Sequence, residues 1–237
     1  MHLIVFDVDG TLTDTTAVGV EGFWHAARGV LHLPPNHPRW LDEVEHYTDL
    51  GIASQHCKIA FGRDLMASEI DLLKRRLVGS LEAALLANAE CIRAMPGAAD
   101  VLAAIGSRSD VCAAIATGCF LASAEFILRK VGLFDGSILM VGCDDAPSRE
   151  AIMLSAARKA GAKHGCQFSA VTYVGDGVWD IKAARNLGWG FIGIAAGDGA
   201  EQLRKAGAAL VLPNFSPIEE FFEALSKAAL RRQPGGA

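Results

Sequence analysis

The sequence predicts an α/β fold in which a Rossmann-like, doubly wound parallel sheet forms the core and an all-α cap domain is inserted into it. Short apolar runs recur along the chain without polar alternation, and most are followed by a stretch with helical spacing. This pattern is typical of parallel strands covered by helices on both faces. One long segment, residues 14–95, shows helical spacing alone. The 237 residues, of which 51% are hydrophobic, are enough for one or two folded domains.

The first strand is expected at residues 3–6, an apolar run with β-branched members that ends abruptly in an acidic segment. A helix is expected to start after Pro96-Gly97 and to lead back to the second strand. The remaining strands are expected at residues 111–116, 138–141, 170–174, 191–194 and 209–212. The helices that follow them are expected near residues 120–131, 148–160, 178–187, 200–206 and 217–229.

The inserted segment is expected to be helical throughout. Its helices are expected near residues 18–30, 41–46, 52–61 and 67–87. Pro34, Pro35 and Pro38 break the chain between the first two, and Phe23 and Trp24 are interpreted as core residues rather than as ligand-stacking rings. The predicted organisation is a core domain of residues 1–13 and 96–230, a helical cap domain of residues 14–95 and a flexible tail of residues 231–237.

Charge and composition exclude several classes of protein. Lys and Arg number 22 and Asp and Glu 27, a formal net charge of −5, so a general nucleic-acid or anionic-membrane surface is not expected. No apolar stretch is long and continuous enough to span a bilayer, and the amino-terminal residues lack the features of a signal peptide. The six cysteines show no CxxC motif and no metal-type spacing, which indicates reduced thiols in a cytoplasmic protein.

Acidic and hydroxyl residues follow the expected strands where these strands end. They are Asp7 and Asp9 after the first strand, Thr117 and Gly118 after the second, and Asp176 and Asp180 after a later one. Ligands of an open parallel sheet collect at the carboxyl ends of its strands, so these residues are expected to converge on one edge. Several carboxylates without His or Cys suit Mg²⁺, which commonly accompanies phosphoryl substrates.

The spacing of the first acidic pair indicates two different tasks. In an extended segment Asp7 and Asp9 point the same way, so one can attack an electrophile while the other handles a proton. Thr117 offers a hydroxyl, and Gly118 allows its backbone N–H to approach an anion closely. A cation such as Arg149 would balance negative charge in the transition state.

These motifs, in this order, resemble those of the haloacid dehalogenase-like hydrolase superfamily, in its phosphatase branch with a helical C1-type cap. Residues 7–11 match the opening DxDGT motif of that family. Thr117 with Gly118 matches the second motif, an apolar strand ending in Thr or Ser, and residues 175–180 match the last motif, GDxxxD. The resemblance spans nearly the whole chain and implies a phosphatase with an inserted helical cap.

The resemblance also implies roles for single residues. Asp7 would be the nucleophile that forms an aspartyl-phosphate, and Asp9 would be the general acid for the leaving group and then the base for water. Thr117 and the Gly118 amide would hold the phosphoryl oxygens.

The metal ligands follow from the same resemblance. Mg²⁺ would be bound by the Asp7 carboxylate, the backbone carbonyl of Asp9 and Asp176. Asp180 would be an inner- or outer-sphere support.

The third family motif is where this chain departs from the pattern. The family has a Lys or Arg here, often in a KPxP run, whereas residues 145–152 read DAPSREAI. Arg149 is the candidate cation, and Arg158 and Lys159 are poorer ones further along. An Arg would keep the positive charge but supply a planar fork rather than a point donor.

A polar cluster in the insert is the candidate for substrate selection. Cap loops of this family often reach into the site, and by that analogy His46, Tyr47, Thr48 and Asp49 are specificity candidates. The ring of Tyr47 packs equally well against the cap core.

The function expected from this resemblance is Mg²⁺-dependent hydrolysis of a small phosphomonoester, similar to that of phosphoglycolate phosphatase-like enzymes. The expected partner is a small phosphorylated metabolite, with no nucleic acid and no membrane, and the sequence leaves the oligomeric state open. Asp9 argues against dehalogenation, because the dehalogenase branch lacks this second acid. The alternatives are a phosphomutase of the same superfamily and a non-catalytic module that binds phosphorylated metabolites.

Overall fold

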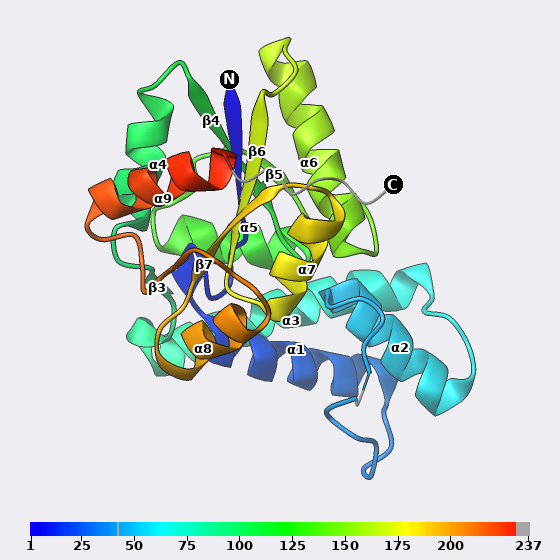
Figure 1. Ribbon diagram of the computed structural model, residues 1–237. Coiled ribbons are helices and arrows are strands. Elements are labelled where there is room, and N and C mark those ends of the chain that lie inside the picture. Colours follow the sequence, from blue (N-terminus) through cyan, green and yellow to red (C-terminus); the bar gives the residue numbers. More distant parts are fainter. Residues whose placement is uncertain (42, 231–237) are drawn as a thin grey trace.

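The core of the molecule is a six-stranded parallel sheet. The computed structural model describes residues 1–41 and 43–230. The strand order is β5-β4-β1-β6-β7-β8, and every pair of neighbours is parallel (Figure 1). The strands are β1 (His2–Phe6), β4 (Val111–Ala116), β5 (Leu139–Val141), β6 (Ala170–Gly175), β7 (Gly190–Ile194) and β8 (Val211–Leu212). The predicted doubly wound sheet is confirmed.

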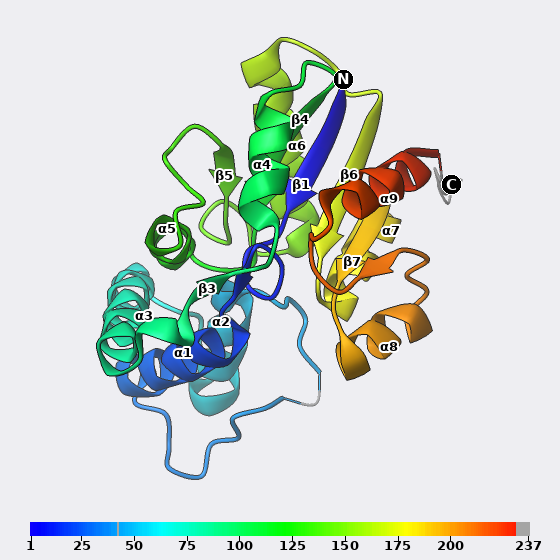
Figure 2. The same ribbon diagram turned by 90° about the vertical axis from the view of Figure 1, so that its left-hand side faces the viewer.

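Helices cover both faces of this sheet, as the apolar strands require. Figure 2 shows α4 and α9 on one face and α6 and α7 on the other. The helices of the core are α4 (Ala98–Gly106), α5 (Leu121–Lys130), α6 (Arg149–His164), α7 (Val178–Asn186), α8 (Gly197–Lys205) and α9 (Ile218–Leu230). Each lies within a few residues of its predicted position.

Strand β1 lies at the centre of the sheet and of the hydrophobic core. Its residues 3–6 have no exposed surface, because β4 and β6 flank the strand and helices cover its two faces. Phe6 packs against Phe215 and Phe221, with ring centroids 6.0 Å and 6.1 Å away. The position of β1 fixes the acidic residues that follow it.

The inserted segment contributes three helices below the carboxyl end of β1 (Figure 1). They are α1 (Thr16–Leu31), α2 (Asp49–Phe61) and α3 (Ala67–Ala87). Helix α3 packs on α1 with a buried stripe of Leu73, Leu77 and Leu81, spaced four residues apart as a helix face requires.

The short antiparallel pair of β2 (Thr13–Asp14) and β3 (Arg93–Ala94) lies where the chain enters and leaves the insert, and the 3₁₀ helix η1 (Ala89–Cys91) precedes β3. This pair was not predicted, because two-residue strands are too short to show a period.

One predicted helix is absent. Residues 41 and 43–46 are not helical, and residue 42 lies outside the described residues. Six residues make barely two turns, and isolated helices of that length are not stable without tertiary packing. The preceding prolines leave the segment as a loop, whose Leu41 and Val44 line a cavity described below. The predicted flexible tail, residues 231–237, also lies outside the described residues.

All six cysteines are free thiols. Among the described residues, no helix combines the length and the apolar character that crossing a membrane requires.

Candidate active site

The predicted site residues follow β1, β4 and β6 directly, and the strands bring them to one edge of the sheet. Asp7 continues the ladder beyond β1, because its amide donates to the carbonyl of Val174 at 2.9 Å. Thr117 does the same beyond β4, with its amide 3.0 Å from the carbonyl of Val141. Asp176 comes directly after β6.

The turn after β1 brings the chain back against Asp176. Gly10 has a φ of +76°, and a Cβ atom there would lie 2.2 Å from Asp176 Oδ2. Only glycine fits this position, for both its backbone conformation and its space. The Thr11 hydroxyl lies 3.5 Å from Asp176 Oδ1. The glycine of the DxDGT motif therefore permits the close approach of two motifs that are distant in sequence.

Three carboxylates form a tight group at this edge. Oxygen atoms of Asp7, Asp176 and Asp180 lie within 4.8 Å of one another. Burial, together with the charges of Asp180 and Asp7, raises the pKa of Asp176 well above its ordinary value. Burial, with a further contribution from Asp7, raises the pKa of Asp180 to about 7.

This donor set fits a magnesium ion. Carboxylate oxygens are the ligands that Mg²⁺ prefers, and a divalent charge would offset the repulsion among these three closely grouped acids. One oxygen of Asp180 is fixed by the backbone, because Oδ2 accepts a hydrogen bond from the Gly177 amide at 2.9 Å. Asp180 Oδ1 has no hydrogen-bond partner among the described residues, although it lies 2.9 Å from Arg149 Nη1.

Arg149 reaches the same carboxylates from the first turn of α6. Its side chain is 10% exposed, and Nη1 lies 2.9 Å from Asp7 Oδ2 and 3.3 Å from the Tyr173 hydroxyl. The Tyr173 hydroxyl in turn donates to the carbonyl of Ala116. Of the predicted cations, Arg149 is the one that the structure brings to Asp7, whereas Lys159 pairs with Asp145 and Arg158 is exposed.

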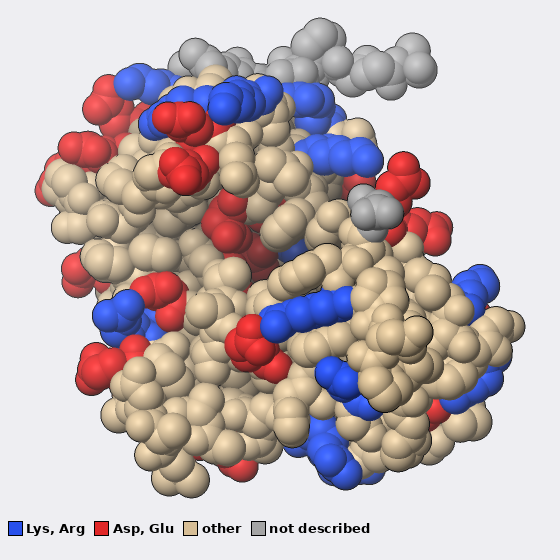
Figure 3. Space-filling model, turned by 90° about the horizontal axis from the view of Figure 1, so that it is seen from below, with Lys and Arg blue, Asp and Glu red and all other residues tan. Residues whose placement is uncertain are grey.

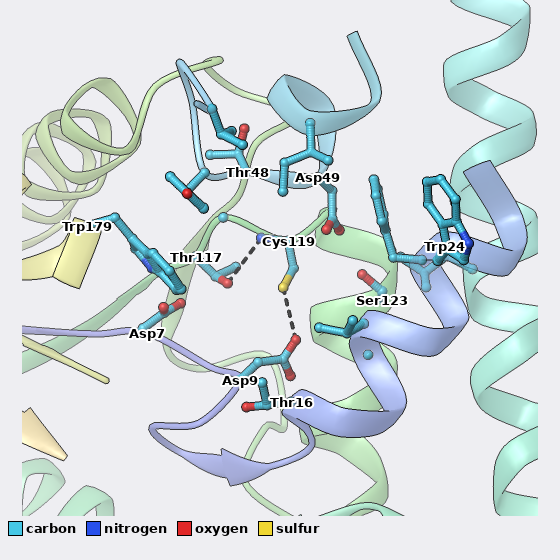
Figure 4. Close-up of a pocket in the computed structure, with 18 of the residues that line it drawn as sticks. Asp7, Asp9, Thr16, Trp24, Thr48, Asp49, Thr117, Cys119, Ser123 and Trp179 are labelled. Atoms are coloured by element: carbon cyan, nitrogen blue, oxygen red, sulfur yellow. Dashed lines mark hydrogen bonds between the residues drawn. The ribbon is translucent and has the colours of Figure 1, made fainter. Parts of the chain in front are cut away.

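Asp9 has an environment different from that of Asp7. The Thr15 hydroxyl donates to Asp9 Oδ1, and Cys119 Sγ lies 3.2 Å from Asp9 Oδ2 (Figure 4). Burial raises the pKa of Asp9 above its ordinary value. Its side chain stands apart from the three grouped carboxylates, and two donors orient it.

The loop after β4 is closely packed between the core and the insert. The hydroxyl of Thr117 accepts a hydrogen bond from the Cys119 amide at 3.2 Å. A Cβ atom at Gly118 would lie 2.6 Å from Arg149 Nη2 and 2.9 Å from the carbonyl of Tyr47. A glycine at this position lets the loop, Arg149 and the insert meet.

Three of the four predicted specificity residues line the cavity. Thr48 caps the amino-terminal end of α2, because its hydroxyl oxygen accepts from the Gly51 amide, and the same hydroxyl donates to the carbonyl of Pro147 at 3.0 Å. Asp49 Oδ2 accepts from the Phe120 amide at 3.0 Å, at the start of α5. Burial raises the pKa of Asp49 to about 7. Both side chains attach the insert to the core.

Tyr47 and His46 differ in position although they are neighbours. The ring of Tyr47 stacks on Trp179 with centroids 4.7 Å apart, and its carbonyl accepts from Arg149 Nη2 at 3.1 Å. His46 does not line the cavity, and its Nε2 lies 3.8 Å from Glu45. The structure therefore brings Tyr47 to the site and leaves His46 outside it.

A cavity of about 350 Å³ joins these residues. Figure 3 shows a hollow in this face with acidic side chains inside it and mostly uncharged ones around it. Asp7, Asp9, Thr117 and Arg149 line one side, and residues of α1, α2, α3 and the loop before α2 line the other. The insert therefore closes over the carboxyl ends of the strands.

Several lining residues were not predicted as site residues. Trp179 lies inside the GDxxxD motif, so its position in the sequence alone could have indicated that it belongs to the site. Phe23 and Trp24 were interpreted as core residues, and both do pack, partly buried, against the hydrophobic core, but they also line the cavity. Their spacing on α1 is the same for a packed face and for a cavity wall, so no local pattern separates the two cases.

Comparison with known protein families assigns this chain to one of them. A model of the haloacid dehalogenase-like hydrolases matches residues 1–188. The chain belongs to this hydrolase family. The predicted resemblance is confirmed, and a purely non-catalytic module is not the class that the comparisons support.

Relatives of this hydrolase are named as phosphatases. The phosphoglycolate phosphatase of Synechococcus elongatus is 30% identical over 206 residues, which are 81% of this chain and 85% of that protein. Among solved structures, a hydrolase from Pseudomonas syringae aligns with a TM-score of 0.64 at 23% identity, covering 97% of this chain and 100% of that one. A putative β-phosphoglucomutase from Bacteroides vulgatus aligns with a TM-score of 0.67 at 20% identity, covering 97% and 90%. The two structures show the shared fold.

Proposed function

We propose that this hydrolase is a Mg²⁺-dependent phosphohydrolase of a small phosphomonoester, and that it works through an aspartyl-phosphate on Asp7. The observation that carries the proposal is the placement of Asp7. Its carboxylate lies on the cavity, 2.9 Å from Arg149 Nη1 and within 4.8 Å of carboxylate oxygens of Asp176 and Asp180. A nucleophile, a cation and a set of metal ligands thus meet at one point.

In the proposed reaction, an Asp7 oxygen attacks the phosphorus atom and the bond to the leaving oxygen breaks. Burial raises the pKa of Asp9, which gives its proton to that oxygen. Asp9 then takes a proton from a water whose oxygen attacks the phosphorus atom, so that the phosphorus–oxygen bond to Asp7 breaks and phosphate is released. The Thr117 hydroxyl and the Gly118 amide hold phosphoryl oxygens, and Arg149 stabilises their charge.

The residues that would hold Mg²⁺ are Asp7, Asp176 and Asp180, with the backbone carbonyl of Asp9. When bound, the ion supplies Lewis-acid stabilisation of the phosphoryl oxygens.

We further propose that residues 14–95 act as a cap on a core of residues 1–13 and 96–230. The contacts that support this division join the insert to the core around the cavity, as in the bond from Thr48 to Pro147 and the one from Phe120 to Asp49. A cap of this kind excludes water from the phosphoryl group while the ester is bound.

The test is hydrolysis of p-nitrophenyl phosphate by purified protein with Mg²⁺, with EDTA in place of Mg²⁺, and by Asp7→Asn with Mg²⁺. We expect turnover that needs Mg²⁺ and that falls by at least about a thousandfold in Asp7→Asn. Turnover that survives Asp7→Asn would overturn the covalent mechanism. Isomerisation of a sugar phosphate faster than phosphate release would instead identify the mutase alternative.

The names of the curated relatives make 2-phosphoglycolate the first natural ester to assay. Like p-nitrophenyl phosphate, it is small and carries one phosphoryl group.

A further inference from the structure

The insert forms the cavity wall opposite Asp7, and this wall is apolar and rich in aromatic rings. Trp24 and Phe23 come from α1, Trp40 from the loop before α2, and Leu77 from α3. Figure 4 shows Trp24 across the pocket from Asp7 and Trp179. These side chains lie where the organic part of a phosphomonoester would extend once its phosphoryl group is at Asp7.

The size of the cavity exceeds what glycolate needs. A volume of about 350 Å³ lies within the range of sites that enclose ring-bearing ligands. Phosphoglycolate adds only two carbons and a carboxylate to the phosphoryl group. It would leave most of the apolar wall without a partner.

The charges around the cavity disfavour a second anionic group on the substrate. Among the described lining residues the cations are Arg149 and Arg39. Arg149 is engaged by Asp7 and Asp180, and Arg39 Nη2 lies 2.5 Å from Glu21 with its guanidinium over the ring of Trp40. Both described cations of the wall therefore already have acidic partners, and their Nε atoms are the groups without a hydrogen-bond partner among the described residues. A substrate carboxylate would have to compete with these acids for the two arginines.

Several polar groups of the wall are engaged within the protein, although Trp179 Nε1 has no hydrogen-bond partner among the described residues. His56 Nδ1 lies 2.8 Å from His37 Nε2, and the His56 ring packs 5.3 Å from the ring of Trp24. The Ser123 hydroxyl donates to the carbonyl of Phe120. A leaving group rich in hydroxyls would lose its water there without gaining equal hydrogen bonds.

We propose that the ester which this site selects carries an uncharged aromatic group, and that Trp24 and its neighbours bind that ring. The proposal rests on the proposed phosphohydrolase function. In the reaction, the phosphorus–oxygen bond to the aromatic alcohol breaks, the alcohol oxygen takes the proton of Asp9, and an uncharged aromatic alcohol leaves. The preceding reaction must then phosphorylate such an alcohol, or an aromatic precursor of it.

The test compares three alkyl esters, so that leaving groups of similar chemistry are released: 2-phenylethyl phosphate, ethyl phosphate and 2-phosphoglycolate. We expect kcat/KM for 2-phenylethyl phosphate to exceed both others by at least about tenfold, which corresponds to about 1.4 kcal/mol. Equal or faster turnover of 2-phosphoglycolate or ethyl phosphate would overturn the aromatic assignment while leaving the phosphatase intact. Failure on all three esters and on p-nitrophenyl phosphate would instead remove the proposed function.

Variants of the cavity wall test where the aromatic ring of the substrate binds. Trp24→Ala should lower kcat/KM for 2-phenylethyl phosphate at least about tenfold and leave ethyl phosphate within about twofold, which also reports that the enzyme is folded. Val20→Phe narrows the cavity without removing a packed core residue and should have the same selective effect. Arg28→Ala, an exposed change on the same helix away from the cavity, is the matched control and should change neither ester. Equal losses on both esters in Val20→Phe, or no loss in either cavity variant, would contradict the proposal.

Discussion

At the scale of single residues, Asp7 and Asp9 lie two positions apart and have different partners. Arg149 lies 2.9 Å from Asp7, whereas Thr15 and Cys119 donate to Asp9. A charge-paired carboxylate is suited to attack, and a carboxylate with a raised pKa is suited to proton transfer. The two roles that we propose for these aspartates therefore differ through environment rather than through residue type.

Asp9→Asn should make the enzyme sensitive to its leaving group. We expect kcat/KM for ethyl phosphate to fall by about 10²- to 10⁴-fold, because the departing alkoxide needs a proton. The same quantity for p-nitrophenyl phosphate should fall much less, because p-nitrophenolate leaves without one. Steady-state kinetics on the two esters gives both values. Losses of the same size on both would show that Asp9 is not the acid.

Arg149 should tolerate replacement by Lys better than by Met. Met leaves Asp7 and Asp180 without their cation, so kcat/KM on p-nitrophenyl phosphate should fall by about 10²- to 10³-fold. Lys keeps a charge but loses the fork that spans Asp7, Asp180 and Tyr47, so part of the activity should return. If Lys and Met reduce the rate equally, the charge of Arg149 is not what the reaction uses.

The residues of the site could be predicted from the sequence at the motif positions but not on the cavity wall. The motif residues follow strand ends, and the edge of a parallel sheet brings strand ends together. Trp24 and His46 depend instead on how α1 and the loop before α2 dock on the core. That docking is set by contacts between distant segments, and no local spacing reports it.

At the scale of elements, the insert is attached to the core by helix-end contacts. Asp49 of α2 accepts from the Phe120 amide at the start of α5, and Lys74 of α3 lies 2.5 Å from Asp144. The Leu121 amide also donates to Asp144. Two acidic side chains thus meet the amino-terminal end of α5, where the helix dipole favours negative charge.

Asp49→Ala should weaken this attachment. The Phe120 amide would lose its partner, which we expect to lower the free energy of unfolding by about 1 kcal/mol and to raise KM. Urea unfolding and steady-state kinetics measure the two effects. Asp64→Ala, an exposed acidic change in the connection between α2 and α3, is the control and should leave KM unchanged. Unchanged KM in Asp49→Ala would indicate that this contact does not position the cap.

The element boundaries were predicted where the period was long enough to read. Helices α3 and α6 span many turns and were found within a few residues, whereas the helix predicted at residues 41–46 is absent from the described residues of that range, 41 and 43–46. The β2–β3 pair joins residues about eighty positions apart, so no window of sequence contains it.

At the scale of the whole molecule, apolar strands without alternation predicted the parallel sheet and its two helical layers. The order β5-β4-β1-β6-β7-β8 was not predicted, because equally apolar strands do not encode their neighbours.

The stability of the whole molecule depends on pH through His56, a histidine inside the insert. Burial lowers the pKa of His56 to about 4, with a further contribution from His37.

His56 should make the protein less stable in acid. The unfolded chain binds a proton at His56 near its ordinary pKa of 6.5 and the folded chain only near 4. Its stabilising contribution is therefore complete above about pH 6.5 and is lost as the pH falls towards 4, by roughly 2–3 kcal/mol. Urea unfolding of the wild type and His56→Phe at pH 7.5, 5.5 and 4.5 should show a smaller pH dependence in the variant. Parallel curves would contradict a neutral, buried His56.

The covalent step on Asp7 is tested most directly in Asp9→Asn with p-nitrophenyl phosphate, because this ester needs no acid and the variant lacks the base for water. We predict a burst of p-nitrophenolate close to one per enzyme. After rapid acid quench and digestion with trypsin, the peptide from Met1 to Arg28 should carry one added phosphoryl group at Asp7. Steady release of p-nitrophenolate and phosphate together, with that peptide unmodified, would contradict the mechanism.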